Sequence, residues 1–386
     1  MDENTGLDPE CLEQLRNPPQ EPVDISCPDL RLALDLFLAT TNSSQETYTS
    51  IRKAIFRHFG VEILSYDQIK RRVAELSGVI PVASDMCINS CLAYTGPFAE
   101  LDTCPTCGEP RYDPIQLAAS GGKKQVARQQ FHTIPIGPQL QALWRDADSA
   151  LNLRYREEIT TEILAELERN EGLLNSYDDF FHGSDYLTAV AEGRIKRDDI
   201  VLMFSLDGAQ LYQNKASDCW IAIWVVLDHA PDRRYKKPRI LPGFIIPGPN
   251  KPKIMDSFLF LSLHHLIGLQ KEGLAIWDAS RDILFSSNPF FALGTADGPG
   301  ITYLNGLVGH HGRTGCRLYC PLKGRHKPGG SHYYPALRKP LNYHVEGCDH
   351  DDVDPSVFLR VLPKCTKIIY ASSLALQVKI STKNDG

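Results

Sequence analysis

Apolar side chains recur every three or four residues over residues 30–39, 47–60 and 65–78. This period is typical of amphipathic helices, and Ser65 stands where an N-cap residue is expected. We therefore predict that residues 29–80 form a helical region, a small structural bundle. DNA binding by the same helices stays open as an alternative, because they carry many basic side chains. These are Arg52, Lys53, Arg57, Lys70, Arg71 and Arg72.

The pattern changes near residue 199, where short and continuously apolar stretches replace the helical period. Such stretches are typical of buried strands. Strands are predicted over residues 199–208, 219–229, 239–249 and 290–297, and helices over residues 257–273 and 301–312. Three strands, a helix, a strand and a helix form an α/β order. We expect a twisted mixed sheet that starts with a three-strand antiparallel meander. We expect the first and fourth strands to be neighbours, because this would bring Asp207 and Asp297 together.

These patterns divide the chain into six parts. We expect a disordered acidic tail (1–28), the helical region (29–80), a cysteine-rich zinc-knuckle module (81–113), a linker followed by amphipathic helices (114–198), a sheet-containing domain with a basic Cys/His-rich insertion (199–352) and a C-terminal tail (353–386). Disorder is expected at the N-terminus because prolines and acids dominate there and no apolar period is visible.

Composition adds a restriction and a charge asymmetry. Hydrophobic residues make up 42% and charged residues 23% of the 386 positions, as in ordinary globular proteins. No apolar run of about 18 residues occurs, so we expect no membrane partner. We also expect no secretory signal, since the chain starts with polar and acidic residues. The net charge is −6, yet residues 298–345 contain seven Lys/Arg and no acid, which favours a basic face for nucleic acid.

Four of the eleven cysteines have metal-ligand spacing. Cys87, Cys91, Cys104 and Cys107 follow the pattern C-x3-C-x12-C-x2-C. Two close pairs on two turns can supply the tetrahedral thiolate set that Zn²⁺ prefers. We therefore predict one structural zinc ion. Four reduced core cysteines are the alternative, but they would not explain the paired spacing.

A second cysteine pair, Cys316 and Cys320, lies in the basic stretch and has histidines nearby. It predicts a second zinc site, with reduced cysteines on a basic surface as the alternative. The basic residues of the same stretch are candidates for phosphate contacts, or else line a solvated loop. They are Arg313, Arg317, Lys323, Arg325 and Lys327.

Two acids terminate predicted strands. Asp207 and Asp297 each follow an apolar stretch, and each is followed by glycine. Acids at the ends of neighbouring core strands can hold Mg²⁺ or Mn²⁺ for phosphodiester chemistry. A strand that ends in Asp-Gly is, however, often only a turn.

Several short motifs follow one another in a specific order between about residue 30 and about residue 350. They are MCINSC with CPTCGEPRY, FHTIPIGPQLQALW, MFSLDGAQLYQ, IIPGPNKP, WDA, TADGPG, NGLVGHHGRTGCRLYCPLKGRHKPGG and HYYPALRKP. This ordered set resembles the transposases of CACTA-type (En/Spm-type) DNA transposons, in the version found in mushroom-forming fungi.

The resemblance implies a nuclear protein with a partial RNase H-like sheet that cuts and joins DNA at transposon ends, using an acidic triad and Mg²⁺ or Mn²⁺. Asp207 matches the first acid and Asp297 the second, while Asp278 competes for a metal-site role. The four N-terminal cysteines match the family's zinc knuckle. Cys316 and Cys320 match a two-cysteine motif that the family usually writes as C-x2-C.

After about residue 352 the sequence no longer resembles the family, whose third acid lies in that part. We therefore expect a truncated copy of a transposase. The alternative is a non-catalytic, zinc-containing fragment that binds DNA or another partner. The expected partners are the DNA of transposon ends and a second copy of the chain.

Overall fold

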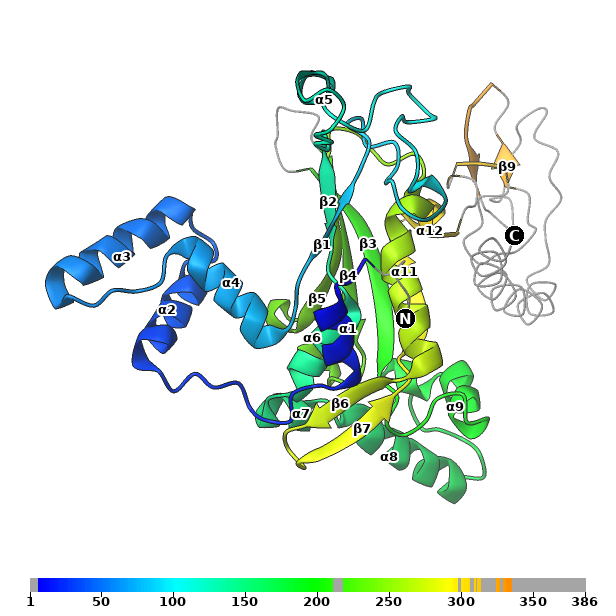
Figure 1. Ribbon diagram of the computed structural model, residues 1–386. Coiled ribbons are helices and arrows are strands. Elements are labelled where there is room, and N and C mark those ends of the chain that lie inside the picture. Colours follow the sequence, from blue (N-terminus) through cyan, green and yellow to red (C-terminus); the bar gives the residue numbers. More distant parts are fainter. Residues whose placement is uncertain are drawn as a thin grey trace. The chain divides into compact units, whose positions relative to one another are not determined.

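The computed structural model describes residues 6–210, 218–297, 300–305, 309, 311–313, 324–326 and 329–334. The chain separates into two compact units, Met1–Thr295 and Ala296–Gly386, and each is described by itself. The first unit combines helices with a central sheet, so the protein has a mixed α/β structure (Figure 1). Within the described residues, no helix has the length and apolar character needed to cross a membrane.

The central sheet has six strands in the order β1-β2-β5-β4-β3-β8. Their bounds are β1 Val82–Asp85, β2 Gln130–Thr133, β3 Val201–Gln210, β4 Asp218–Val226, β5 Ile240–Ile246 and β8 Phe290–Ala296. The pairs β3–β4 and β4–β5 are antiparallel, which confirms the predicted meander. β8 lies beside β3, which confirms the predicted neighbours.

Four strands of the first unit were not predicted from the sequence. β1 and β2 pair antiparallel and continue the sheet beyond β5. β6 (Leu274–Asp278) and β7 (Ile283–Ser287) form a separate two-stranded hairpin. Each of these strands has only four or five residues, which is too short for an alternating pattern to stand out.

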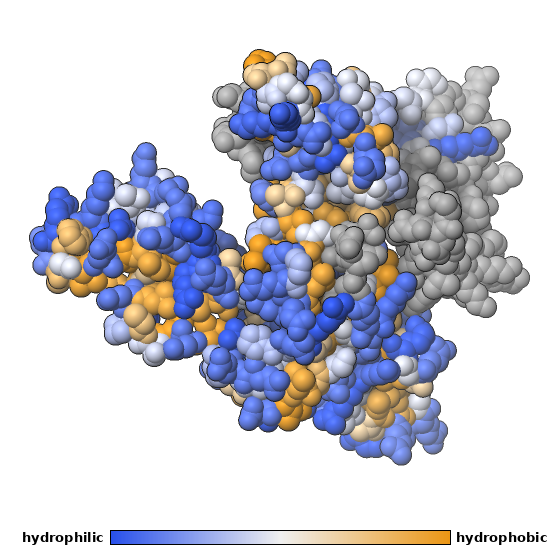
Figure 2. Space-filling view, in the orientation of Figure 1, coloured by the Kyte–Doolittle hydropathy of each residue, from blue (hydrophilic) through white to orange (hydrophobic). Residues whose placement is uncertain are grey.

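The helices α2 (Pro28–Ala39), α3 (Gln45–Phe59) and α4 (Tyr66–Ser77) form what we call the helical lobe, as the apolar period predicts. Ser65 and Gln68 form a capping box at the start of α4. Tyr48, Ile63 and Ile69 are fully buried between the helices. The surface of this lobe mixes hydrophobic and hydrophilic residues (Figure 2).

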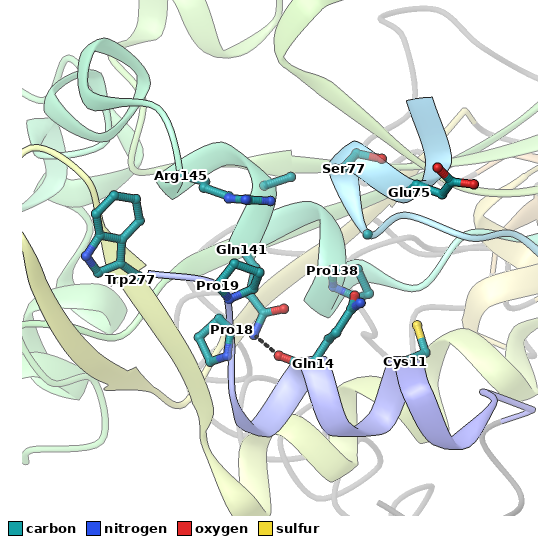
Figure 3. Close-up of a pocket in the computed structure, with 12 residues that line it drawn as sticks. Cys11, Gln14, Pro18, Pro19, Glu75, Ser77, Pro138, Gln141, Arg145 and Trp277 are labelled. Carbon is teal, nitrogen blue, oxygen red and sulfur yellow. Dashed lines mark hydrogen bonds between the residues drawn. The ribbon is translucent and has the colours of Figure 1, made fainter. Parts of the chain in front are cut away.

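The expected disorder of residues 1–28 is corrected by the structure, which contains the helix α1 at Pro9–Arg16. Leu15 of α1 is 1% exposed. The side chain of Gln141 donates hydrogen bonds to the carbonyls of Gln14, Leu15 and Ala275, at 3.2, 3.1 and 2.8 Å. α1 is therefore held by partners more than 120 residues away, beside a small pocket of about 50 Å³ (Figure 3).

The other α-helices of the first unit are α5 (Pro114–Ala119), α6 (Ile136–Trp144), α7 (Ala147–Asn152), α8 (Tyr155–Arg169), α9 (Ser184–Ala191), α10 (Pro231–Arg234) and α11 (Met255–Glu272). The second unit contains α12 (Ile301–Asn305). Phe181 and Tyr186 pack with Val201 of β3 and Val225 of β4 in one core cluster. On α11, Phe258 meets Phe131 of β2 with ring centroids 5.1 Å apart.

His265 joins α11 to the start of α6 inside the core. Its Nε2 accepts a hydrogen bond of 3.1 Å from the backbone N–H of Gly137. A Cβ at Gly137 would lie 3.0 Å from this nitrogen and 2.7 Å from Leu15, so the contact requires glycine. The His265 side chain is 2% exposed, and burial is the main cause that lowers its pKa to about 3.

We expect the free energy of unfolding to fall as the pH falls from about 6.5 toward 3. The unfolded state binds a proton at His265 near pH 6.5, whereas the folded state binds it only near pH 3, so acid favours unfolding by ~1.4 kcal/mol per pH unit. His265→Gln keeps an acceptor for Gly137 and should remove that part of the slope. Urea midpoints measured across this pH range test it, with His58→Gln on exposed α3 as the control. An unchanged slope in His265→Gln would contradict the assignment.

Candidate metal centre

The first cysteine pair lies in a tight hairpin that follows β1. The backbone N–H of Cys87 donates to the carbonyl of Leu92 at 2.9 Å, and that of Ser90 donates to Cys87 O at 2.8 Å. Ser90 has φ of 56°, a left-handed conformation that closes the turn. The backbone N–H of Asn89 points at Cys87 Sγ, 3.4 Å away. The turn thus places Cys87 and Cys91 on one side and directs a donor at sulfur.

The second pair lies in a similar turn. Cys104 N donates to the carbonyl of Glu109 at 2.9 Å, and Gly108 N donates to Cys104 O at 2.8 Å. Gly108 has φ of 75°, which a residue with a Cβ rarely adopts. Cys107 Sγ receives the backbone N–H of Glu109 and lies 3.7 Å from the side-chain amide of Asn89. Asn89 therefore connects the two turns.

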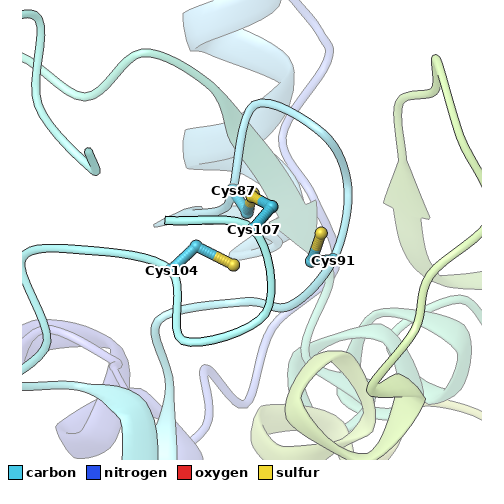
Figure 4. Close-up of side chains that lie close together, drawn as sticks. All are labelled: Cys87, Cys91, Cys104 and Cys107. Atoms are coloured by element: carbon cyan, nitrogen blue, oxygen red, sulfur yellow. The ribbon is translucent and has the colours of Figure 1, made fainter. Parts of the chain in front are cut away.

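The four sulfurs converge on one point (Figure 4). Every pair lies within 4.8 Å, and Cys87 Sγ is 3.5 Å from Cys107 Sγ. Zn–S bonds of about 2.3 Å in a tetrahedron place sulfurs about 3.8 Å apart, so the spacing fits. Cys87, Cys91 and Cys104 are buried and Cys107 is exposed. The four cysteines could hold a metal ion such as zinc. Among the described residues, they are the group of three or more potential ligand side chains that lie close enough together for this.

The protonation of these thiols follows from their surroundings. Burial is the main cause that raises the pKa of Cys87 and of Cys91 above the ordinary thiol value. Burial acts in the same direction on Cys107, but hydrogen bonds from Glu109 N–H and from Asn89 outweigh it and lower the pKa to about 7. A metal ion binds thiolates, so binding must release protons and weakens as the pH falls.

Hydrogen bonds attach the first turn to the start of α11. The carbonyl of Cys91 accepts from the backbone N–H of Lys253 at 3.1 Å and of Ile254 at 2.9 Å. The N–H of Ala93 donates to Ser257 Oγ at 2.8 Å, and Thr95 Oγ1 donates to Ser257 O. These partners lie about 160 residues further along the chain, so neither the spacing nor the motif of the cysteines could reveal them.

We expect removal of the metal to loosen this attachment. Chelation would free Cys91 from its fixed geometry, and the amides of Lys253 and Ile254 would lose their acceptor. Hydrogen exchange there should rise at least about tenfold after chelation, because local opening then costs less free energy. Peptides from β4 serve as the internal reference and should keep their exchange rate. Unchanged protection at residues 253–257 in metal-free protein would contradict the expectation.

The predicted catalytic acids occupy different environments. Asp207 lies inside β3, opposite Ile221 of β4, rather than at the strand end that the sequence suggests. Its carboxylate is exposed and accepts a hydrogen bond from the adjacent Gly208 N–H, at 2.7 Å. Asp297 follows β8, is exposed and belongs to the second unit. Its Oδ1 accepts from Gly300 N–H at 2.6 Å, ahead of α12.

The competitor Asp278 has no free lone pairs to offer a metal. It is 0% exposed, and Arg154 and Arg281 donate to its Oδ2 at 2.9 and 2.7 Å. The backbone N–H and hydroxyl of Ser280 donate to Oδ1 at 2.9 and 2.6 Å. Burial alone would raise the pKa of Asp278, but these hydrogen bonds outweigh it and lower the pKa. Asp278 is a structural anchor of the β6–β7 hairpin.

The second candidate cluster falls mostly outside the described residues. Cys316 and Cys320 lie outside them, as do Arg317, Lys323 and Lys327. Arg313 is described and exposed, whereas Arg325 is 8% exposed. Of the metal ligands predicted from the sequence, the structure therefore brings together Cys87, Cys91, Cys104 and Cys107.

Sequence reasoning missed Asn89 and Arg111. The spacing C-x3-C marks the turn that contains Asn89, but nothing local marks Arg111, which forms an ion pair with Asp85 at 2.8 Å.

Comparison with models of known protein families gave no match, and comparison with curated proteins gave none either.

Proposed function

We propose that this chain is a transposase-related nuclear protein that acts on DNA in transposition. The observation that carries the proposal is the order of strands in the sheet. β3, which contains Asp207, lies beside β8, which leads directly into Asp297. The resemblance of the ordered motifs to CACTA-type transposases, of the fungal version, supports the same reading and assigns these two acids to metal binding.

The proposed chemistry is in-line displacement at phosphorus, with water as the first nucleophile and a DNA 3′-hydroxyl as the second. The resemblance assigns Asp207 and Asp297 to Mg²⁺ or Mn²⁺, which would activate the attacking oxygen and offset charge on the phosphate. The exposure of Asp207 supports this role, because an exposed carboxylate is accessible to a metal ion from solvent. The basic stretch around Arg313 would contact DNA phosphates.

The cysteine cluster has a structural role in this proposal. Four protein ligands leave no open position for a substrate on the metal, which is typical of structural zinc rather than catalytic zinc. The zinc would keep the two turns folded and attached to residues 253–257. It would thereby support the β5–α11 connection of the same sheet that contains Asp207.

The hydrogen bonds of Asp278 favour a second candidate function. In this alternative the chain contains zinc and binds DNA but does not cleave it. This acid is fully engaged by Arg154, Arg281 and Ser280. Among the described acids that the sequence singles out, only Asp207 and Asp297 then remain for a metal. Two carboxylates position metal and water less well than three.

The test compares cleavage and binding in one set of samples. The full chain is incubated with Mg²⁺ or Mn²⁺ and with duplex DNA that flanks its gene. Cleavage that Asp207→Asn abolishes, and that the exposed Asp198→Asn leaves intact, would support the transposase activity. Salt-dependent binding without cleavage by either protein would support the second function. Absence of both DNA binding and cleavage would overturn the two together.

A further inference from the structure

A hollow of about 470 Å³ lies beside α3 in the helical lobe. It is separate from the metal centre and from the acids discussed above. One wall is a face of α3 and the other is the segment that leads from α3 to α4. Its lining residues are Ser50, Arg52, Lys53, Phe56, Arg57, Glu62 and Ile63.

The wall opposite α3 is held in place by hydrogen bonds. Arg52 Nε donates to the carbonyl of Ile63 at 2.5 Å, and its Nη2 lies 3.6 Å from Glu62 Oε1. The hydroxyl of the buried Tyr48 donates to the carbonyl of Leu64 at 2.8 Å. These contacts hold residues 62–64 against α3. The hollow is therefore formed by two segments that hydrogen bonds fix to each other.

An exposed aromatic ring lies among cations in this hollow. Phe56 is 56% exposed. It lies one helical turn after Arg52 and directly before Arg57, and all three residues line the hollow. Lys53 and Arg57 are exposed, and within the described residues neither forms an ion pair with an acid. The hollow therefore combines three basic side chains, one acidic side chain and an accessible flat apolar surface.

This combination fits single-stranded nucleic acid better than a duplex. Aromatic side chains bind unpaired bases by stacking on their faces, and basic side chains beside them bind the phosphates. The bases of a duplex are already stacked on one another and cannot cover Phe56. A negatively charged polymer is also the partner that two unpaired cations attract.

We propose that the hollow binds an unpaired nucleotide of single-stranded DNA, with its base on Phe56 and its phosphates at Lys53 and Arg57. The choice of DNA rests on the proposed function, whereas the choice of an unpaired strand rests on the hollow itself. Frayed or nicked DNA ends offer such a strand.

The experiment measures binding of fluorescein-labelled oligo-dT and of a duplex of equal length to the full chain by anisotropy. Phe56→Ala and Phe56→Leu should both weaken oligo-dT binding by about tenfold, because neither retains a flat ring. Phe56→Tyr should keep it. Phe59→Ala removes another exposed ring of α3 that does not line the hollow, and it should have no effect.

The charges are tested by salt dependence. Lys53→Gln with Arg57→Gln should reduce the slope of log affinity against log salt by about 1.4, the value for two single-strand phosphates. Lys70→Gln with Arg71→Gln on α4 is the matched control and should leave the slope unchanged.

Three outcomes would overturn the inference: equal loss in Phe56→Ala and Phe59→Ala, full binding by Phe56→Leu, or tighter binding of an acidic peptide than of oligo-dT. DNA binding that is insensitive to all Phe56 variants would remove this site and leave the proposed function standing. No binding to either DNA would remove both.

Discussion

Cys91→Ser should lose the bound metal and unfold residues 86–113. Serine has nearly the volume of cysteine, but its hydroxyl is a poor ligand for zinc, so the set drops to three thiolates. Apparent binding free energies of structural zinc are about 10–16 kcal/mol in small domains, and this part of the chain has few other core contacts to replace them. Its core cluster consists largely of the cysteines themselves with Leu92 and Tyr94. The zinc content of the four-cysteine cluster should fall from one ion to near zero.

The measurement combines metal analysis of the purified chain with hydrogen exchange over residues 86–113. Cys219→Ser is the matched control, since Cys219 is also buried but lies in β4, away from the cluster. It should retain the zinc. Full zinc content in Cys91→Ser, or equal zinc loss in Cys219→Ser, would refute the four-cysteine ligand set.

Asp228→Asn should destabilise the first unit by about 3–5 kcal/mol, a large part of the total stability of most domains. Asp228 and Arg156 form an ion pair of 2.7 Å with side chains 5% and 6% exposed. Burial alone would lower the pKa of Arg156, but the charge of Asp228 outweighs it and raises the pKa. A guanidinium stays protonated at any pH at which the protein is folded, so in the variant the buried charge of Arg156 loses its partner.

Denaturant midpoints measure this loss. Arg197→Ala breaks the exposed pair with Glu157, which lies on the same helix as Arg156, and should cost far less stability. Arg156→Met combined with Asp228→Leu should recover only part of the stability. Arg156 also donates to the carbonyls of Arg197 and Asp199, and Asp228 accepts from Val201 N–H, so the double variant leaves these groups unpaired. An Asp228→Asn protein as stable as the original would show that the pair contributes nothing.

Local pattern was sufficient for those elements in which enough apolar residues follow one another to form a recognisable pattern. The period of the apolar residues identified α2, α3, α4 and α11, since a helix repeats every 3.6 residues. The apolar runs identified β3, β4, β5 and β8, because these strands are long or deeply buried. Local pattern failed at the short strands β1, β2, β6 and β7, which exist because a partner strand is nearby.

The candidate site shows the same division. The spacing of Cys87, Cys91, Cys104 and Cys107 identified the four thiols that converge and could hold a metal ion, because each pair needs only one tight turn to converge. The role of Asp278 could not be predicted from its motif. Its ion pair with Arg154 joins residues 124 positions apart, and this contact converts a candidate metal ligand into a structural anchor.

By itself the sequence determined the helical lobe, the antiparallel meander and the four cysteines that could hold a metal ion. These features depend on periodicity, strand order and spacing, which are local properties of the chain. Only the tertiary structure decided that α1 is ordered, that the cysteine turns are attached to α11, that Asp278 is engaged and that α3 borders a basic hollow with an exposed ring. Each of these depends on contacts that a linear pattern does not encode, because their free energy comes from groups that meet only after the chain has folded.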